Sequence, residues 1–369
     1  MATPQSAKIS EEVLQELSST DYACSSLDQL SGGTANFVFK GILINPLPDG
    51  TKEVAVKHGE SYIASMPDFQ LSTARCRAEE ECLKALSTLP ATDGAFTVRA
   101  PKLYHFNPKT NTQVQEYLPN ALSLKDYAIK HFSSSRDPFR TVSCHELGRC
   151  LGVWLREFHD WVKLPEQAEL HKEAKANQPM QQLKHYVNYA TLVETVGNFP
   201  TILEDERETL EKIRDTAAEE LKDPNLQVIH GDFWTGNALL PDQPLKLQDQ
   251  TPVFIVDWEI CQLGLPALDL GQMIAELYEL SLFKGIDEGK WLIEGFVAGY
   301  GYVDDDFAFR TALHVGTHLV AWGSRVPGWG TEEQVQHVVG VGKDIVLHAW
   351  HKDRAWFEAG DLACLFDSR

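Results

Sequence analysis

The segment His230-Gly-Asp-Phe-Trp-Thr-Gly-Asn237 decides the fold, and Asp257-Trp-Glu259 follows it twenty residues later. Within the first segment an aspartate and an asparagine stand five residues apart in a polar loop. Short β-rich runs lie at 227–230 and 252–257, and each leads into one of the two polar segments. The pattern therefore predicts two carboxylates and a carboxamide at adjacent strand-to-loop junctions.

These residue types fit phosphoryl transfer. A carboxylate such as Asp232 can orient the attacking hydroxyl and receive its proton, while Asn237 and Asp257 offer the oxygen ligands that magnesium takes. The alternative is a structural turn, because Gly-Asp and Gly-Asn pairs commonly form turns. The flanking strands and the later Asp-x-Glu sequence favour the catalytic interpretation.

On these motifs the chain resembles the aminoglycoside phosphotransferase group of the protein-kinase-like fold, which includes choline kinases and methylthioribose kinases. The resemblance implies that Asp232 is the catalytic base and that Asn237 and Asp257 bind magnesium. Glu259 is similar to a second metal-binding acid of the choline and methylthioribose kinases, although Trp258 replaces the proline of the Asp-Pro-Glu pattern.

Two further residues match the family pattern. Asp269 resembles an aspartate that braces the catalytic loop by hydrogen bonds, and its alternative role is a helix N-cap. His159 matches a histidine that ends a family helix, and we expect it to be a core residue. His314, His318 and His348 are likewise expected to be core or surface residues rather than metal ligands.

The resemblance implies an ATP site in the first part of the chain. Ser31–Phe37 is similar to the glycine loop of methylthioribose kinases, and the resemblance implies that Gly32, Gly33 and Asn36 contact the phosphates. A Gly-Gly hairpin turn would have the same sequence pattern. Lys57 ends Val-Ala-Val-Lys, the pattern of the strand lysine that contacts the α- and β-phosphates, although any half-exposed strand can end in lysine.

The family pairs this lysine with a helix glutamate, for which Glu79, Glu80 and Glu81 are candidates. We choose Glu79 by its distance from Leu86 and expect the other two to form a solvated face. The connector Glu116-Tyr117-Leu118 is expected to read adenine through its backbone.

The expected fold class is α+β, with a nucleotide-binding lobe at 1–118 and a mainly helical catalytic and substrate-binding lobe at 119–369. Strands are predicted at 37–44, 53–57, 101–106 and 112–118. Helices are predicted at 10–18, where Ser10 serves as cap, and at 73–89, 144–161, 178–196, 203–221, 268–283, 289–300, 305–322 and 331–350.

Composition limits the class of protein. The net charge of −20 argues against a nucleic-acid surface, and no apolar run reaches the length of a membrane helix. Seven scattered cysteines without a CxxC pair are typical of reduced thiols in a cytoplasmic protein. The sequence gives no indication of the oligomeric state.

The substrate is expected to be a small molecule with a hydroxyl group: an aminoglycoside, an amino alcohol or a sugar-like compound. Carboxylates at Glu276 and Glu279, with tryptophans such as Trp322 and Trp329, suit a cationic substrate, whereas aromatic residues at helical spacing are often core. Arg325 suits an anionic or sugar-like substrate instead. Two alternatives to a small-molecule kinase are an inactive nucleotide-binding pseudokinase and a protein kinase, although the latter's Ala-Pro-Glu segment is absent.

Overall fold

The computed structural model describes residues 4–30, 34–133, 140–248, 250–326 and 328–367. The chain forms two compact units that alternate along the sequence. The first unit comprises Met1–Thr88, Ala100–Pro119 and Val256–Glu259, and the second comprises Leu89–Arg99, Asn120–Ile255 and Ile260–Arg369. The single division after residue 118 stays a prediction.

An antiparallel five-stranded sheet, in the order β1-β2-β3-β8-β7, forms the first unit. Its strands are β1 (Cys24–Gln29), β2 (Phe37–Leu43), β3 (Glu53–His58), β7 (Leu103–Asn107) and β8 (Thr112–Glu116). Four of them confirm the predicted strands, and β1 was missed. A separate short hairpin is made of β4 (Tyr62–Ile63) and β5 (Met66–Gln70). Side chains of β2 alternate between buried and half-buried, as one core-facing surface requires.

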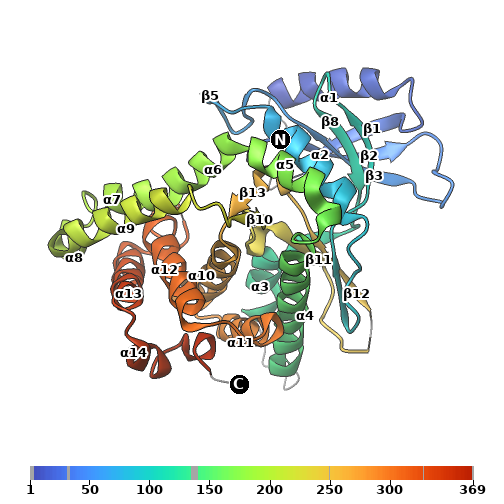
Figure 1. Ribbon diagram of the computed structural model, residues 1–369. Coiled ribbons are helices and arrows are strands. Elements are labelled where there is room, and N and C mark those ends of the chain that lie inside the picture. Colours follow the sequence, from blue (N-terminus) through green and yellow to red (C-terminus); the bar gives the residue numbers. More distant parts are fainter. Residues whose placement is uncertain (1–3, 31–33, 134–139, 249, 327, 368–369) are drawn as a thin grey trace. The chain divides into compact units, whose positions relative to one another are not determined.

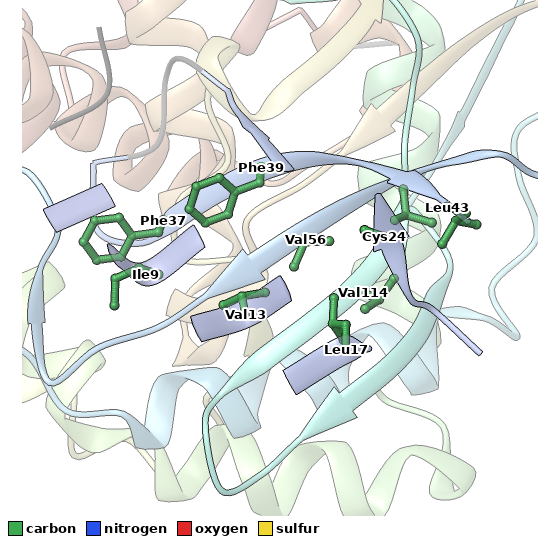
Figure 2. Packing of buried hydrophobic residues seen from close by; sticks show 10 residues of the cluster. Ile9, Val13, Leu17, Cys24, Phe37, Phe39, Leu43, Val56 and Val114 are labelled. Carbon is green, nitrogen blue, oxygen red and sulfur yellow. The ribbon is translucent and has the colours of Figure 1, made fainter. Parts of the chain in front are cut away.

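Helix α1 (Pro4–Leu17) packs against this sheet. Figure 2 shows the residues on its core side, which are spaced four apart: Ile9, Val13 and Leu17. They share one cluster with buried side chains of β2, β3 and β8. The helix predicted at 10–18 is therefore too short. It begins at Pro4, whose fixed φ suits a first helical turn, so Ser10 lies inside the helix and does not cap it.

Helices dominate the second unit (Figure 1). The α-helices are α3 (Leu124–Phe132), α4 (Arg140–Trp161), α5 (Ala168–Ala176), α6 (Gln178–His185), α7 (Thr191–Thr195), α8 (Pro200–Leu203), α9 (Arg207–Glu220), α10 (Pro266–Lys284), α11 (Glu288–Tyr300), α12 (Asp305–Ala321), α13 (Glu332–Trp350) and α14 (Arg354–Glu358). Five predicted helices are confirmed as α4, α10, α11, α12 and α13. The predicted 178–196 helix is interrupted by a π-helical segment at Tyr186–Ala190, and 203–221 is divided between α8, a 3-10 turn at Glu204–Glu206 and α9. No helix in the described ranges is both long and apolar enough to cross a bilayer.

Glycines allow α4 and α11 to pack backbone against backbone. A Cβ on Gly148 would lie 2.2 Å from the carbonyl oxygen of Leu292, and one on Gly152 would lie 2.0 Å from that of Phe296. No side chain fits at either position. This close crossing brings the end of α4, which carries His159, next to Tyr300 at the end of α11.

Two small sheets of the second unit support the polar loop. One consists of β6 (Phe96–Arg99), β12 (Thr251–Ile255), β11 (Ala238–Pro241) and β9 (Ala121–Ser123), and in it β12 runs parallel to β6. The other pairs β10 (Gln227–Ile229) with β13 (Gln262–Gly264). The strands predicted at 227–230 and 252–257 are β10 and β12, but β12 ends at Ile255, two residues before Asp257.

Candidate active site

The loop of the second unit that carries Asp232 and Asn237 leaves β10 through a glycine. Gly231 has φ of +80°, and a Cβ there would lie 2.4 Å from the carbonyl oxygen of Ile260, so this position requires glycine. The loop ends in a 3-10 turn at Thr235–Asn237. This turn brings the Asn237 side chain back to Asp232, because Asn237 Nδ2 donates to the Asp232 carbonyl at 2.9 Å and to Asp232 Oδ2 at 3.1 Å.

Asp269 holds this loop from α10. Its Oδ2 accepts from the backbone N–H of His230 and its Oδ1 from that of Gly231, both at 2.9 Å. The brace expected from sequence is therefore present, whereas the N-cap role is wrong because α10 begins at Pro266. Burial alone would raise the pKa of Asp269, but the hydrogen bond and charge of His159 and the contacts with His230 lower it below its ordinary value.

His159 is the core residue that the sequence predicts. It is almost fully buried, its Nε2 lies 3.1 Å from Asp269 Oδ2, and its Nδ1 lies 2.9 Å from the hydroxyl of Tyr300. The other three histidines considered in the sequence also bond protein side chains: His314 with Tyr189, His318 with Glu276, and His348 with Asp353.

Two residues that sequence reasoning missed support Asp232, one directly and one through the other. Gln272 Nε2 donates to Asp232 Oδ1 at 2.7 Å, and Lys184 Nζ donates to Gln272 Oε1. Gln272 stands three residues after Asp269, hence on the same side of α10, and that spacing was an available signal. Lys184 comes from α6, and nothing in its local sequence connects it with Asp232.

The first unit brings together three of the residues assigned to nucleotide and metal. Lys57 on β3 lies 2.9 Å from Glu79 Oε1 on α2 (Ala74–Leu86) and also pairs with Asp257 Oδ1. The choice of Glu79 as partner is thus confirmed. Burial alone would lower the pKa of Lys57, but the carboxylates of Asp257 and Glu79 raise it.

The other two candidate acids turn to Lys84. Glu80 lies 2.5 Å and Glu81 lies 3.2 Å from its Nζ. Glu80 is buried, so the expectation of a solvated face is wrong for this residue.

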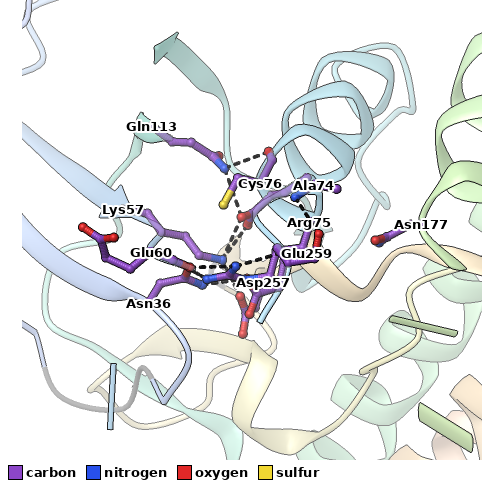
Figure 3. A network of polar contacts seen from close by, with 12 residues as sticks. Asn36, Lys57, Glu60, Ala74, Arg75, Cys76, Gln113, Asn177, Asp257 and Glu259 are labelled. Atoms are coloured by element: carbon purple, nitrogen blue, oxygen red, sulfur yellow. Dashed lines mark hydrogen bonds and ion pairs between the residues drawn. The ribbon is translucent and has the colours of Figure 1, made fainter. Parts of the chain in front are cut away.

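A buried arginine of the first unit, Arg75, connects Glu259 with Asn36 (Figure 3). Arg75 Nε donates to Glu259 Oε2 at 2.8 Å, and Arg75 Nη2 donates to Asn36 Oδ1 at 3.0 Å. Asn36 Nδ2 closes the triangle on Glu259 Oε2 at 2.7 Å. Burial is the main cause of the raised pKa of Glu259, which Lys57 and Arg75 oppose. Sequence reasoning missed Arg75, because helices often carry arginine on their exposed side.

The carboxylates of the first unit are close enough together for a divalent cation. One oxygen each from Glu79, Asp257 and Glu259 lies within 4.8 Å of the others. Asp257 has φ of +67°, a conformation uncommon outside glycine and found at functional sites. The donor set is oxygen-rich, as magnesium prefers, so the residues fit this metal.

The remaining assigned positions are less informative. Gly32 and Gly33 lie outside the described residues. Glu116 ends β8 and its Oε2 accepts from the N–H of Lys102, the ring of Tyr117 lies 5.2 Å from Lys40 Nζ, and Leu118 is buried. Their part in adenine binding stays a prediction.

A cluster of the second unit combines aromatic faces with carboxylates around an ammonium group. Lys125 Nζ lies 4.1 Å from the ring centre of Trp329, 5.3 Å from that of Trp234 and 3.7 Å from Glu276 Oε2. Glu279 Oε1 is buried and has no hydrogen-bond partner among the described residues. Burial and the charge of Glu276 raise the pKa of Glu279 well above its ordinary value.

Comparison with known proteins identifies the class. The phosphotransferase enzyme family matches residues 44–311, so the chain belongs to this family, and it is a small-molecule kinase. It is 32% identical over 366 residues to phosphotransferase FrzJ of a Cladobotryum species, covering 95% of this chain and 94% of the relative. It is 22% identical over 338 residues to 4-hydroxytryptamine kinase of Psilocybe cyanescens, covering 90% and 89%.

Among solved structures, the GDP complex of wild-type aminoglycoside 2′-phosphotransferase-IIIa has a TM-score of 0.51 at 15% identity, over 94% of this chain and 99% of that chain. The expected α+β, protein-kinase-like fold is thus confirmed. Membership of the family also implies a nucleotide as phosphate donor.

Proposed function

We propose that the protein transfers the γ-phosphate of ATP to a hydroxyl group of a small molecule, with Asp232 as the base. The main support is the way Asp232 is held. Its loop is fixed by Asp269, and each of its carboxylate oxygens accepts from a side-chain amide, Gln272 on one and Asn237 on the other. Such a carboxylate has a fixed direction and retains lone pairs for the hydroxyl proton of an acceptor.

We further propose that Asn237, Asp257 and Glu259 hold magnesium and that Lys57 contacts the phosphates of ATP. The metal supplies positive charge that neutralises the β- and γ-phosphate oxygens. The chain's own part is to fix Lys57 between Glu79 and Asp257 and to fix Glu259 through Arg75. Asp257→Ala should therefore remove magnesium-dependent nucleotide binding, which calorimetry with and without magnesium measures.

An acceptor that carries an amine is the substrate class we favour. The cluster around Glu276 already surrounds one ammonium, that of Lys125, with two tryptophan faces and a carboxylate, which is the chemistry that recognises a cationic group. The relative from Psilocybe cyanescens is a kinase of 4-hydroxytryptamine, which has both a hydroxyl and an amine.

A substrate panel tests the proposal. ATP turnover is measured with 4-hydroxytryptamine, with 4-hydroxyindole as its matched control without the amine, with an aminoglycoside and with a sugar. Turnover of the hydroxy-amines above that of the control supports both the reaction and the substrate class. Phosphate appearing on polypeptide alone would indicate a protein kinase, and nucleotide binding without any turnover would indicate a pseudokinase; either result overturns the proposal.

A further inference from the structure

We propose that Lys184 and Gln272 form a positioning pair that sets the orientation of the Asp232 carboxylate. The pair itself is not expected to touch the reacting atoms. The proposal rests on the proposed function, because it assumes that Asp232 is the base.

The contacts run in one line through the second unit. Lys184 Nζ on α6 donates to Gln272 Oε1 on α10, and Gln272 Nε2 donates to Asp232 Oδ1 at 2.7 Å. Lys184 and Gln272 are 7% and 5% exposed, so water has little access to replace either contact. Both bonds join elements far apart in the sequence, and they therefore fix Asp232 against the helices as well as within its own loop.

The direction of the Gln272 amide follows from its two neighbours. A lysine ammonium has only donors, and an ionised carboxylate has only acceptors. A glutamine between them satisfies both when its oxygen faces Lys184 and its nitrogen faces Asp232. In the reversed orientation the amide N–H₂ would face the donor Lys184, and the amide oxygen would face the acceptor Asp232. Lys184 and Asp232 therefore favour the same orientation of the Gln272 amide, and Lys184 fixes it from the oxygen end.

Charge explains why a lysine can occupy this buried place. Burial lowers the pKa of Lys184, while Asp232, Asp269 and Glu276 act in the opposite direction. From α12 the facing titratable group is His314, whose pKa is lowered well below its ordinary value by burial first and then by the charge of Lys184. The three carboxylates thus offset part of the cost of burying the Lys184 ammonium, which donates to the Gln272 side chain.

The pair has a function that Asn237 alone does not supply. Asn237 also donates to Asp232, but it is itself proposed to bind magnesium. Gln272 is the donor to Asp232 with no assigned second role. We therefore expect it to hold the carboxylate while Asn237 serves the metal.

The isosteric change Gln272→Glu separates positioning from packing. The variant keeps the size of the side chain and an acceptor for Lys184, but it has no donor for Asp232 and places a like charge beside it. If the contact of Gln272 with Asp232 had no part in the reaction, this variant would keep its activity. We expect kcat to fall by roughly 10- to 100-fold, with the KM for ATP within about twofold in the folded protein.

Lys184→Met provides the second test, because it removes the donor to the Gln272 amide oxygen and leaves Gln272 itself unchanged. Positioning through Gln272 predicts that Lys184→Met and Gln272→Met each lower kcat and that the double variant loses no more than the larger single loss. Lys184→Arg, which restores a donor, should recover part of the rate. The matched controls are Gln182→Glu and Lys172→Met, both at exposed positions, and they should behave as the unmodified protein.

The result that overturns the inference is an unchanged kcat in Gln272→Glu or a fully additive double variant. Asp232→Ala, measured in parallel, separates this failure from failure of the proposed function. If Asp232→Ala is inactive while Gln272→Glu is fully active, only the positioning role is wrong. If Asp232→Ala retains activity, the proposed function itself is wrong.

Discussion

The replacement Asp269→Asn tests the brace beneath the catalytic loop. It keeps the shape of the side chain but exchanges one acceptor oxygen for an N–H₂ donor. In the native structure both oxygens accept backbone N–H groups, those of His230 and Gly231, and Oδ2 also lies 3.1 Å from His159 Nε2. The new amide can accept on one side only, so one buried backbone N–H would face another donor.

The magnitude follows from these contacts. A hydrogen bond to a charged group contributes about 1.5–3 kcal/mol, and a buried donor left without an acceptor costs about 1–3 kcal/mol. One lost bond and one unsatisfied N–H together predict a decrease of about 2.5–6 kcal/mol in the free energy of unfolding. His230 and Gly231 immediately precede Asp232, and a displacement of the loop by about 1 Å predicts a roughly 100-fold lower kcat.

The assay is thermal unfolding together with steady-state kinetics on the same preparation. The pKa of Asp269 is lowered in the fold, so its charge stabilises the protein at any pH above 3.8, the ordinary pKa of an aspartate. This contribution is lost as the pH falls below 3.8 and through the lowered pKa of the folded state. The stability difference between the two proteins should therefore shrink at strongly acidic pH. Asp160→Asn is the control, since Asp160 is half-exposed on α4 and forms ion pairs with Arg156 and Lys163. Equal stability of Asp269→Asn and Asp160→Asn at pH 7, with unchanged kcat, would refute the reasoning.

Two further predictions concern buried charges. Arg75→Met leaves Glu259 buried without the guanidinium that pairs with it and should destabilise the protein by about 3–5 kcal/mol. Arg77→Met, at an exposed position, should change stability by less than about 0.5 kcal/mol. Urea unfolding of both variants measures the two values, and similar values would contradict the prediction. Because the pKa of Glu279 is raised in the fold, its ionisation costs stability as the pH rises above 4.5, the ordinary pKa of a glutamate. Glu279→Gln should therefore be more stable than the unmodified protein at pH 8 and equally stable below pH 4.5. Melting temperatures across that pH range check the sign, and a constant difference would contradict the assignment.

The sequence predicted the parts of the fold that have strong local periodicity. The strands β2 and β3 alternate clearly, and the long helices α10 to α13 have uninterrupted apolar faces, so both were found with small errors in their ends. The short strands β6, β9 and β13 were missed because three or four residues have no resolvable period and are defined by their partners. The early start of α1 was missed because the apolar residues that set it begin only at Ile9.

The candidate site divides in the same way. Asp232, Asp269 and Lys57 were found because each lies in a motif with fixed spacing. Arg75 and Lys184 were not, because each acts through tertiary contacts with residues more than 80 positions away, which no local pattern encodes. Buried charges of this kind are ordinary helix residues in the sequence and are recognised only when their partners are known.

The most direct test of the account is the rate of phosphate transfer by Asp232→Ala, measured together with its ATP affinity in the presence of magnesium. A positioned base typically contributes about 10²- to 10⁴-fold, so we predict a loss of kcat within that range while the Kd for ATP changes by less than about threefold. A variant that retains more than about 10% of the original kcat with an acceptor hydroxyl would contradict the central claim that this carboxylate receives the proton.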